Sequence, residues 1–583
     1  MRKKKILSAA LAACMGLSLL TGCTGAAEEE TTTDASSMTA LELSKLMGNG
    51  INLGNTMEAY GRSQYGTTAS VTAYETCWGQ PVTTQEMIQG YKDAGFDSIR
   101  IPVAWTNTMN YEDGDYTISQ DFIDRVGEII GWAIDADMYV IINDHWDGGW
   151  WGMFGSADSD TVDQAFELYT SMWTQISEAY ADYDYHLLFA GGNEEIGDRL
   201  NDEIDGQAGV LSEDECYEMA AKINQTFVDT VRATGGNNAD RFLIIPGYNT
   251  DGTMTTSSKF VMPTDTAESK LFVEVHYYTP WNFCGDNTEE GDWGLVSEIK
   301  EMNRFFQMIA TLEDQGYGVI LGEHGPLPYS DGTVKEATVT FLDNLLDNCD
   351  IYNIVPFLWD INALYSKTDC ALATEDLAEL YASRNYEALK DLDEEEYIQS
   401  LKDEISAEIE AAPTEREVVI DYDAIDGSTA WIMWNGTYTY SVGDTYNPSD
   451  CSEGVVATDA EITGEGTYTI SLDFTGTEYG QTNSITFAAI GLSWGEVLYP
   501  GYYIENIQIK VNGEDYPLTA DYYTTADDKV CTRVNLINEW VDKLPDEARR
   551  ADGDLSNASP VIIDKDTFVG IETLEITFDY VAP

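Results

Sequence analysis

Short apolar runs alternate with amphipathic stretches along the first two thirds of the chain. The runs are rich in Val, Ile and Leu and lack polar alternation, as expected of parallel strands covered on both faces. Eight such runs, separated by helical patterns, span residues 50–55, 98–105, 139–145, 187–194, 242–248, 271–278, 318–325 and 353–360. Between residues 38 and 385 they predict an α/β fold, a (β/α)8 TIM barrel. An open doubly wound sheet is the alternative, but no Gly-rich nucleotide loop follows the first run.

The pattern changes twice downstream of the predicted barrel. Residues 386–417 form a strongly acidic helical stretch, which we interpret as a solvated connector. From residue 418 to 583, short segments alternate apolar and polar positions between Gly and Asn turns, at 418–421, 437–441, 467–474, 484–490, 503–511 and 573–581. Alternation of this kind with few helical stretches predicts a β-sandwich as the last domain.

The first residues have the pattern of an export signal. A basic segment at 2–5 precedes an apolar run at 6–20 that is short for a membrane span. The sequence Leu-Thr-Gly-Cys at 20–23 then resembles the cleavage box of bacterial lipoproteins. We therefore predict a signal peptide at 1–23, lipidation of Cys23 and a flexible tether at 24–37. The protein would be a secreted, cell-surface lipoprotein of a bacterium that touches the membrane only through its lipid.

Charge and cysteine usage narrow the possible ligands. The chain has 103 Asp and Glu against 30 Lys and Arg, a formal net charge of −73. A field of that sign repels phosphate backbones and polyanionic polysaccharides, so we expect no nucleic-acid partner, whereas a neutral polymer is compatible. The cysteines are scattered and include no C-x-x-C pair, so we predict neither a metal site nor a cofactor.

Polar and aromatic residues collect where the predicted strands end. Active sites of TIM barrels lie at the carboxyl ends of the strands. Buried Glu, Arg and His side chains at one barrel mouth are more than stability requires, and they indicate a catalytic site. The residues at these ends are Asn55, Arg100, His145, Asn193, Glu194, His276, Tyr278, Glu323 and Trp359.

Motifs at these strand ends resemble glycoside hydrolase family 5, and the stretch at 276–284 is most similar to its subfamily 4. The similarity extends over the whole predicted barrel, in order, at one motif per strand end. The motifs are INLGNT at 51–56, WGQPVTT at 78–84, IRIPV at 99–103, Asn193-Glu194, VHYY at 275–278 and ILGE at 320–323.

The resemblance implies a role for each residue. Glu194 matches the family's acid/base and Glu323 its nucleophile. Asn193 would bind the sugar 2-hydroxyl, and Arg100 would keep Glu323 ionised. The negative charge of Glu323 would in turn raise the pKa of Glu194. The other expected substrate-binding or orienting residues are Asn55, His145, His276, Tyr278 and Trp359. Apart from the resemblance, Trp150 in the loop at 147–151, Trp78 and Trp281 are candidate sugar platforms, with core packing as the alternative for each indole.

The activity that the resemblance implies is that of a retaining endo-β-1,4-glucanase acting on cellulose, mixed-linkage β-glucan or xyloglucan. Alternatives are a related mannanase or xylanase, or a non-catalytic glycan-binding surface lipoprotein. The sequence departs from the family pattern at Trp146 and Glu195, where a second His and a Pro are usual. Attachment to a hydrolase suggests that the sandwich is a carbohydrate-binding module. Its candidate rings are Trp431, Trp434, Tyr438, Tyr440, Trp494, Tyr499, Tyr502 and Tyr503.

Overall fold

The computed structural model describes residues 37–583 except 205, 286–287, 289, 417–424, 444–448, 478–484, 527–528, 542 and 566. The predicted signal peptide, Cys23 and most of the tether lie outside these residues. The chain divides into two compact units, Met1–Glu415 and Arg416–Pro583. Within the described residues, no helix combines the length and the apolar character that crossing a membrane requires.

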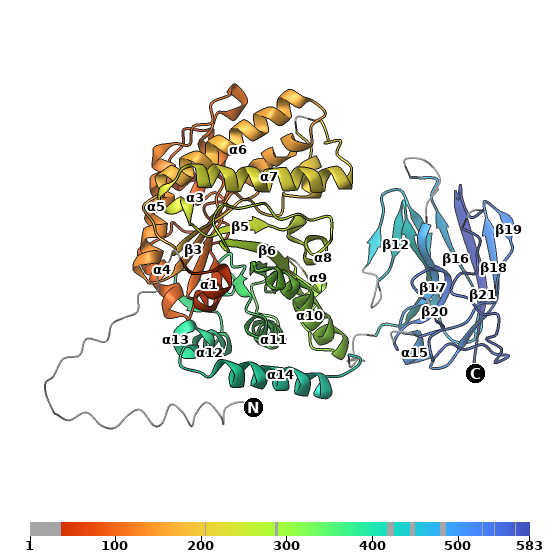
Figure 1. Cartoon of the computed structure of the whole chain (residues 1–583). Coiled ribbons are helices and arrows are strands. Elements are labelled where there is room, and N and C mark those ends of the chain that lie inside the picture. The colour runs from red at the N-terminus through yellow and green to blue at the C-terminus, as the bar shows by residue number, and fades with distance from the viewer. Residues whose placement is uncertain are drawn as a thin grey trace, which may run out of the picture. The chain divides into compact units, whose positions relative to one another are not determined.

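The first unit is a closed barrel of eight parallel strands, which confirms the predicted (β/α)8 fold (Figure 1). Each strand pairs with the next along the chain, and the eighth pairs with the first. The strands are β1 (Gly50–Asn52), β2 (Ser98–Ile101), β3 (Tyr139–Asn143), β4 (Leu187–Ala190), β5 (Leu243–Pro246), β6 (Leu271–Tyr277), β7 (Gly318–His324) and β8 (Val355–Leu358).

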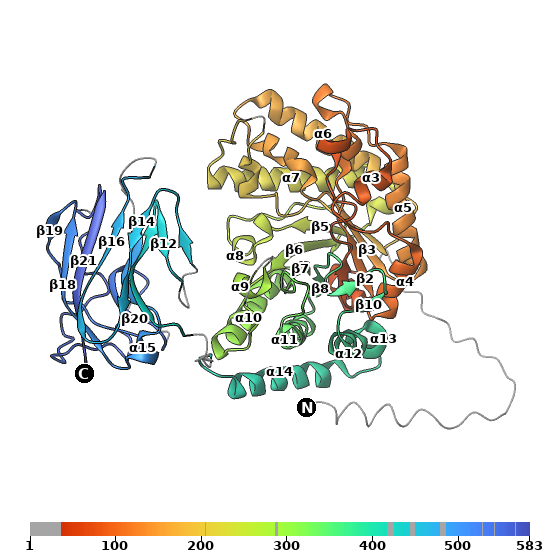
Figure 2. The same ribbon diagram turned by 180° about the vertical axis from the view of Figure 1, so that it is seen from behind.

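Helices surround the barrel (Figure 2). Their starts follow from local sequence: in α7, Ser212 and Glu215 form a capping box that satisfies free backbone N–H groups of the first turn. The fifth strand departs from the repeat, since only the four-residue helix α8 (Gly252–Thr255) follows it directly. The main helices are α1 (Ala40–Met47), α4 (Gln85–Asp93), α5 (Gln120–Asp135), α6 (Ser159–Ala179), α7 (Glu213–Ala233), α10 (Val296–Ile309), α11 (Thr338–Ile351), α12 (Glu375–Arg384) and α14 (Glu394–Ala411).

Side chains along each strand alternate between the barrel interior and the side that faces the helices. On β6, Val273 and Val275 belong to the cluster shared with the surrounding helices, whereas Phe272 belongs to a separate cluster with interior residues of other strands. Glu274 and His276 continue the Phe272 series toward the carboxyl end of the strand. The interior is therefore apolar near the start of β6 and charged near its end.

Most strands end earlier than predicted. The apolar run at 187–194 gives a strand of only Leu187–Ala190, and Gly191 and Gly192 follow it. Asn193 and Glu194 consequently lie on the loop beyond the strand. These two residues are thus held by a short segment that leaves the barrel, whereas Arg100, His276 and Glu323 lie on strands.

The acidic stretch is part of the first unit. Helix α14 buries Leu401 and Ile405, and Asn344 of α11 donates a 2.8 Å hydrogen bond to Glu408. Tyr397 donates to Asp350 at 2.7 Å. The acidic residues occupy the exposed positions of an amphipathic helix, so the interpretation of a fully solvated connector was wrong for this side of the helix.

The second unit is a β-sandwich, as predicted, with one apolar core between two antiparallel sheets. The predicted strand at 418–421 lies outside the described residues. One sheet has the order β13 (Asp450–Cys451), β12 (Thr439–Ser441), β11 (Ser428–Gly436), β17 (Ile485–Leu492) and β20 (Thr532–Asn538), with β15 (Ala460–Ile462) also on β11. The other has β14 (Val456–Thr458), β16 (Gly466–Asp473), β21 (Thr573–Val581), β18 (Tyr503–Val511) and β19 (Glu514–Tyr516).

The predicted aromatic sugar face of the sandwich is not assembled. Trp431 and Trp434 are buried, and Tyr499 and Tyr502 pack against Tyr580 of the core. None of the eight proposed rings is among the exposed large apolar side chains. Trp431 and Trp434 are therefore packed side chains, and the assignment was wrong for these two, whereas Tyr438, Tyr440, Trp494 and Tyr503 remain partly exposed.

The packing of α14 predicts that the first unit requires it. A chain ending at residue 385 loses the burial of Leu401 and Ile405, worth about 1.5–3 kcal/mol each. Its barrel should unfold several degrees lower in a thermal scan than the full chain. A chain ending at Glu415 is the matched control and should keep the barrel transition in place. Equal transitions for both truncated chains would show that α14 contributes nothing to barrel stability.

Candidate active site

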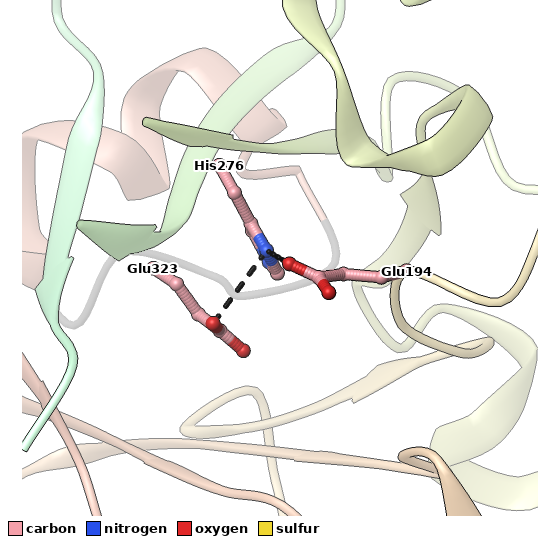
Figure 3. A group of neighbouring side chains, drawn as sticks. All are labelled: Glu194, His276 and Glu323. Carbon is pink, nitrogen blue, oxygen red and sulfur yellow. Dashed lines mark hydrogen bonds and ion pairs between the residues drawn. The ribbon is translucent and has the colours of Figure 1, made fainter. Parts of the chain in front are cut away.

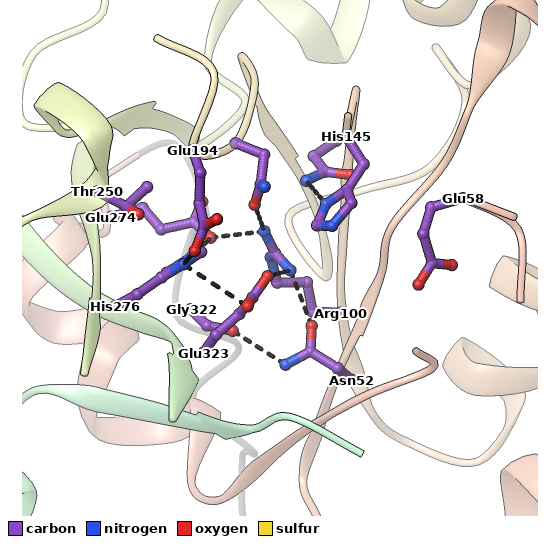
Figure 4. Close-up of polar contacts among 12 residues, drawn as sticks. Asn52, Glu58, Arg100, His145, Glu194, Thr250, Glu274, His276, Gly322 and Glu323 are labelled. Atoms are coloured by element: carbon purple, nitrogen blue, oxygen red, sulfur yellow. Dashed lines mark hydrogen bonds and ion pairs between the residues drawn. The ribbon is translucent and has the colours of Figure 1, made fainter. Parts of the chain in front are cut away.

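A fully buried arginine organises the charged end of the barrel (Figure 4). Arg100 of β2 donates to Asn52 Oδ1 at 2.9 Å and Asn193 Oδ1 at 2.8 Å. It also forms ion pairs with Glu274 at 2.9 Å and with Glu323 at 3.1 Å. Burial opposes the charge of Arg100, but the two carboxylates outweigh it and raise the pKa of the guanidinium. Arg100 therefore links strands β1, β2, β6 and β7 to the loop after β4.

Glu274 is a site residue that the sequence reasoning missed. Its side chain is fully buried, and besides Arg100 it contacts His276 Nε2 at 3.4 Å. A Cβ at position 322 would lie 2.0 Å from Glu274 Oε1, so Gly322 of β7 leaves the space that this carboxylate occupies. The available signal was an acidic residue inside an apolar strand, two positions before His276 and hence on the same face.

Glu194, His276 and Glu323 meet at the barrel mouth (Figure 3). His276 Nδ1 lies 2.9 Å from Glu194 Oε1 and 3.6 Å from Glu323 Oε2. One ligand-type atom from each of the three residues lies within 4.8 Å of the others, so oxygens of the two glutamates approach to at most that distance. The side chain of Glu194 is 41% exposed and that of Glu323 is 7% exposed. The exposed carboxylate of Glu194 can exchange protons with bound molecules, whereas the carboxylate of Glu323 is buried in the barrel wall.

The pKa of His276 is coupled to those of the three carboxylates around it. Burial acts to lower the pKa of His276, but Glu323, Glu194 and Glu274 raise it to about 10. Burial acts to raise the pKa of Glu194, yet the hydrogen bond and charge of His276 outweigh it, and the net direction is down. For Glu323, burial prevails over the charges of His276 and Arg100, and its pKa is raised.

These directions correct one expectation. The sequence predicted that ionised Glu323 would raise the pKa of Glu194, whereas in the structure that pKa is lowered. The reason is that His276 is a cation that donates to Glu194, a role not assigned to it beyond orienting the carboxylates. The positive charge that the three carboxylates favour on His276 therefore stabilises the ionised form of Glu194.

Aromatic residues surround the two glutamates. Tyr278 donates to Glu323 Oε2 at 3.0 Å, and its ring lies edge-on to Trp281, which is 63% exposed. Trp359, at the end of β8, stacks in parallel on His145 with centroids 5.9 Å apart. Burial lowers the pKa of His145 well below its ordinary value, so its ring is neutral at pH 7. Trp281 and Trp359 are placed where flat ligand faces can reach them.

Trp150 is not a sugar platform. Its side chain is fully buried and stacks on Trp151 at 4.7 Å. The segment Asp147–Gly155 forms a 3₁₀ helix that folds inward, and Thr106 donates its backbone N–H and hydroxyl to Asp147. The prediction was wrong because indole burial outweighs exposure in a loop long enough to fold back on itself. The exposed ring of this region is Trp146, which lies beside Trp78 at 6.5 Å, both being more than a third exposed.

Asn55 is displaced from the charge network. Strand β1 ends at Asn52, and Asn52 is the asparagine that contacts Arg100. Asn55 is partly exposed in the left-handed region at φ 55°, three residues farther along the loop.

Glu195 stands where the family pattern usually has Pro. It is buried in an ion pair with Arg199 at 2.6 Å, and burial raises its pKa to about 7.

The glutamate–histidine trio is also the one group of three or more His, Cys, Asp or Glu side chains with metal-ligand proximity among the described residues. A divalent cation there would compete with the proton between His276 and Glu194 and with the guanidinium next to Glu323. The two protein cations already face the carboxylates, and the arrangement suits acid–base and nucleophilic chemistry.

Comparisons with known sequences agree with this geometry. The model of the family described as cellulase (glycosyl hydrolase family 5) matches residues 62–364. A xyloglucan-specific endo-β-1,4-glucanase of Bacteroides ovatus is 36% identical over 343 residues, 55% of this chain and 65% of that protein. Endoglucanase A of Paenibacillus barcinonensis is 31% identical over 377 residues, 59% of this chain and 89% of that protein. The chain thus spans just under two thirds of the Bacteroides relative.

Solved structures are similar over the same part of the chain. The Bacteroides ovatus GH5 xyloglucanase in complex with a XXXG heptasaccharide has a TM-score of 0.52 at 32% identity, covering 59% of this chain and 76% of that one. A GH5-4 broad specificity endoglucanase from an uncultured bovine rumen ciliate has a TM-score of 0.51 at 30% identity, covering 59% and 98%. With the family model matched over half of its length, the chain belongs to glycoside hydrolase family 5.

Proposed function

We propose that the protein is a retaining endo-β-1,4-glucanase that cuts β-glucan by double displacement on Glu323, with Glu194 as acid and then base. The observation that carries the proposal is the approach of the two carboxylates to within 4.8 Å. Retaining glycosidases place their carboxyl groups about 5–5.5 Å apart, whereas inverting enzymes leave about 6.5–9.5 Å for a water molecule. The separation favours direct attack by a carboxylate.

The environments of the two glutamates support their separate roles. Glu323 is buried between Arg100 and Tyr278, and these donors fix its carboxylate and favour its ionised form. Attack on the anomeric carbon forms a glycosyl ester with Glu323 and breaks the bond to the leaving oxygen. Glu194, more exposed, protonates that oxygen and later takes a proton from the water that cleaves the ester.

Proton supply follows from the charges around the site. Glu194, Glu274 and Glu323 face Arg100 and protonated His276, which leaves one negative charge in excess. A bound sugar that excludes water removes solvation from both members of the His276–Glu194 ion pair, which favours the neutral pair and so the transfer of the shared proton from His276 to Glu194. His276 thus loads the acid when substrate binds. Asn193, held by Arg100, is positioned to bind the sugar 2-hydroxyl.

The substrate class is a neutral β-1,4-linked glucan: cellulose, mixed-linkage β-glucan or xyloglucan. The exposed rings of Trp281, Trp146 and Trp78 can stack on pyranose faces. The printed names of the relatives, endoglucanases and a xyloglucan-specific enzyme, support the same class. A mannanase or xylanase would use the same two glutamates and would differ from a glucanase only in the sugars that its cleft accepts.

A substrate panel tests the proposed activity. Purified protein should release reducing ends from barley β-glucan, xyloglucan or carboxymethylcellulose at least about tenfold faster than from mannan or xylan, with a rapid fall in viscosity that marks internal cleavage. The double variant Glu194→Gln, Glu323→Gln keeps the shape of the cleft and serves as the inactive control. Faster release from mannan or xylan would reassign the substrate, and no release from any polymer would favour a glycan-binding protein.

We also propose that the protein is a cell-surface lipoprotein anchored through Cys23. The basic residues 2–5, the apolar run 6–20 and the Leu-Thr-Gly-Cys sequence support it.

Replacing the lipidated cysteine tests the anchor. With Cys23→Ser, the protein should move from the membrane fraction to the medium or persist as uncleaved precursor, because no thiol remains for the lipid. Cys77→Ser is the matched control and should partition like the wild type. Unchanged membrane association of Cys23→Ser would disprove lipidation at this residue.

A further inference from the structure

The sandwich unit carries a cavity separate from the barrel mouth. Its volume is about 210 Å³. It is lined by residues of β11, β12, β13 and β17, which are neighbours in one sheet: Met433, Trp434, Asn435, Thr439, Tyr440, Ser441, Asp450 and Phe487. The lining combines aromatic and aliphatic side chains with amide, hydroxyl and carboxylate groups, the mixture that sugar-sized ligands require.

Strand register explains how the polar part of the cavity is built. Asn435 pairs with Thr439 on one side and with Phe487 on the other, and Phe487 pairs with Asn538. Directly paired residues project to the same face of a sheet, so these four side chains form a row across four strands. Phe487 and Asn538 are buried, and the amide of Asn538 already bonds Trp540 N–H and Asn535, so the polar groups that the row offers are the amide of Asn435 and the hydroxyl of Thr439.

An apolar floor adjoins this row. Trp431 and Met433 alternate with the core-facing residues of β11 and pack with Phe487 and Ala489 in a cluster distinct from the main core. A Cβ at Gly491 would lie 2.6 Å from Met433 and 3.0 Å from Trp431, so the glycine lets these side chains lie flat on the sheet. The apolar side chains on the outer face of this sheet are therefore closely packed against one another.

Trp540 stands at the end of this row. It follows β20 by two residues, is 71% exposed, and its ring centroid lies 6.1 Å from that of Phe487. Asn538, a member of the row, accepts a hydrogen bond from the backbone N–H of Trp540 at 3.2 Å. Trp540 does not line the cavity itself, but it contacts Phe487, which does, so a ligand that occupies the cavity can reach the exposed indole.

We propose that the Trp540 ring and the Asn435–Thr439–Phe487–Asn538 row form a second binding site, which holds a single neutral β-glucan chain. Trp540 supplies flat apolar surface for a pyranose face, the largely buried Phe487 lines the cavity beside it, and the exposed amide of Asn435 and the hydroxyl of Thr439 bond the equatorial hydroxyls. Asp450 in the lining and the net charge of −73 disfavour anionic polymers. The choice of β-glucan rests on the proposed function, whereas the location of the site does not.

Two variants of the full-length protein test the site. Trp540→Ala removes an exposed ring, and Asn435→Ala removes an exposed amide, so neither disturbs the core. The control, Leu498→Ala, removes an exposed apolar side chain of the same unit outside the row. The measurement is the dissociation constant on acid-swollen cellulose and on soluble xyloglucan at 4 °C, alongside the initial rate on soluble barley β-glucan.

Trp540→Ala should raise the dissociation constant about tenfold, the effect of one well-placed aromatic contact, and Asn435→Ala should raise it severalfold. Leu498→Ala should bind like the wild type, and all three should hydrolyse soluble β-glucan at the wild-type rate. Binding by Trp540→Ala equal to the wild type would overturn the site. Loss of binding in Trp540→Ala together with no hydrolysis by the wild type would keep the site and reject the enzyme.

Discussion

The active-site geometry depends on one buried charge, the guanidinium of Arg100. It is fully buried, and four partners from four different segments bind it: Asn52, Asn193, Glu274 and Glu323. Removing one partner of a buried ion pair costs about 3–5 kcal/mol, so the loss of either carboxylate would destabilise the whole network around Arg100. Arg100 therefore fixes the distance between the loop after β4, which carries Glu194, and the end of β7, which carries Glu323.

Much of the barrel could be predicted from the sequence because its strands are covered on both faces. Uninterrupted runs of Val, Ile and Leu mark such strands, and all eight were located. Their ends were placed too late, since residues such as Asn193 and Glu194 follow the apolar run without belonging to the strand. Glu274 was missed for the opposite reason: it lies inside a strand, and only its pairing with Arg100 explains a charge at that position.

The strands of the sandwich that are buried on both faces were harder to predict from the sequence. Alternation located β16, β18 and β21 well, whereas β11 and β20 show no alternation because side chains pack on both sides of their sheet. The same packing removes Trp431 and Trp434 from the surface and leaves Trp540 exposed. A sequence pattern reports that an indole is present, but only the packing of its neighbours decides whether it faces a ligand.

The central claim is that Glu323 forms the covalent bond and Glu194 moves the proton. The most direct test is mass spectrometry of the protein after reaction with a 2-deoxy-2-fluoro-β-cellobioside that has a good leaving group, since the fluorine slows hydrolysis of the glycosyl ester. We predict one added cellobiosyl mass on the peptide containing Glu323, in the wild type and in Glu194→Ala, and none in Glu323→Ala. Label on Glu194, or turnover with inverted configuration and no label, would contradict this account.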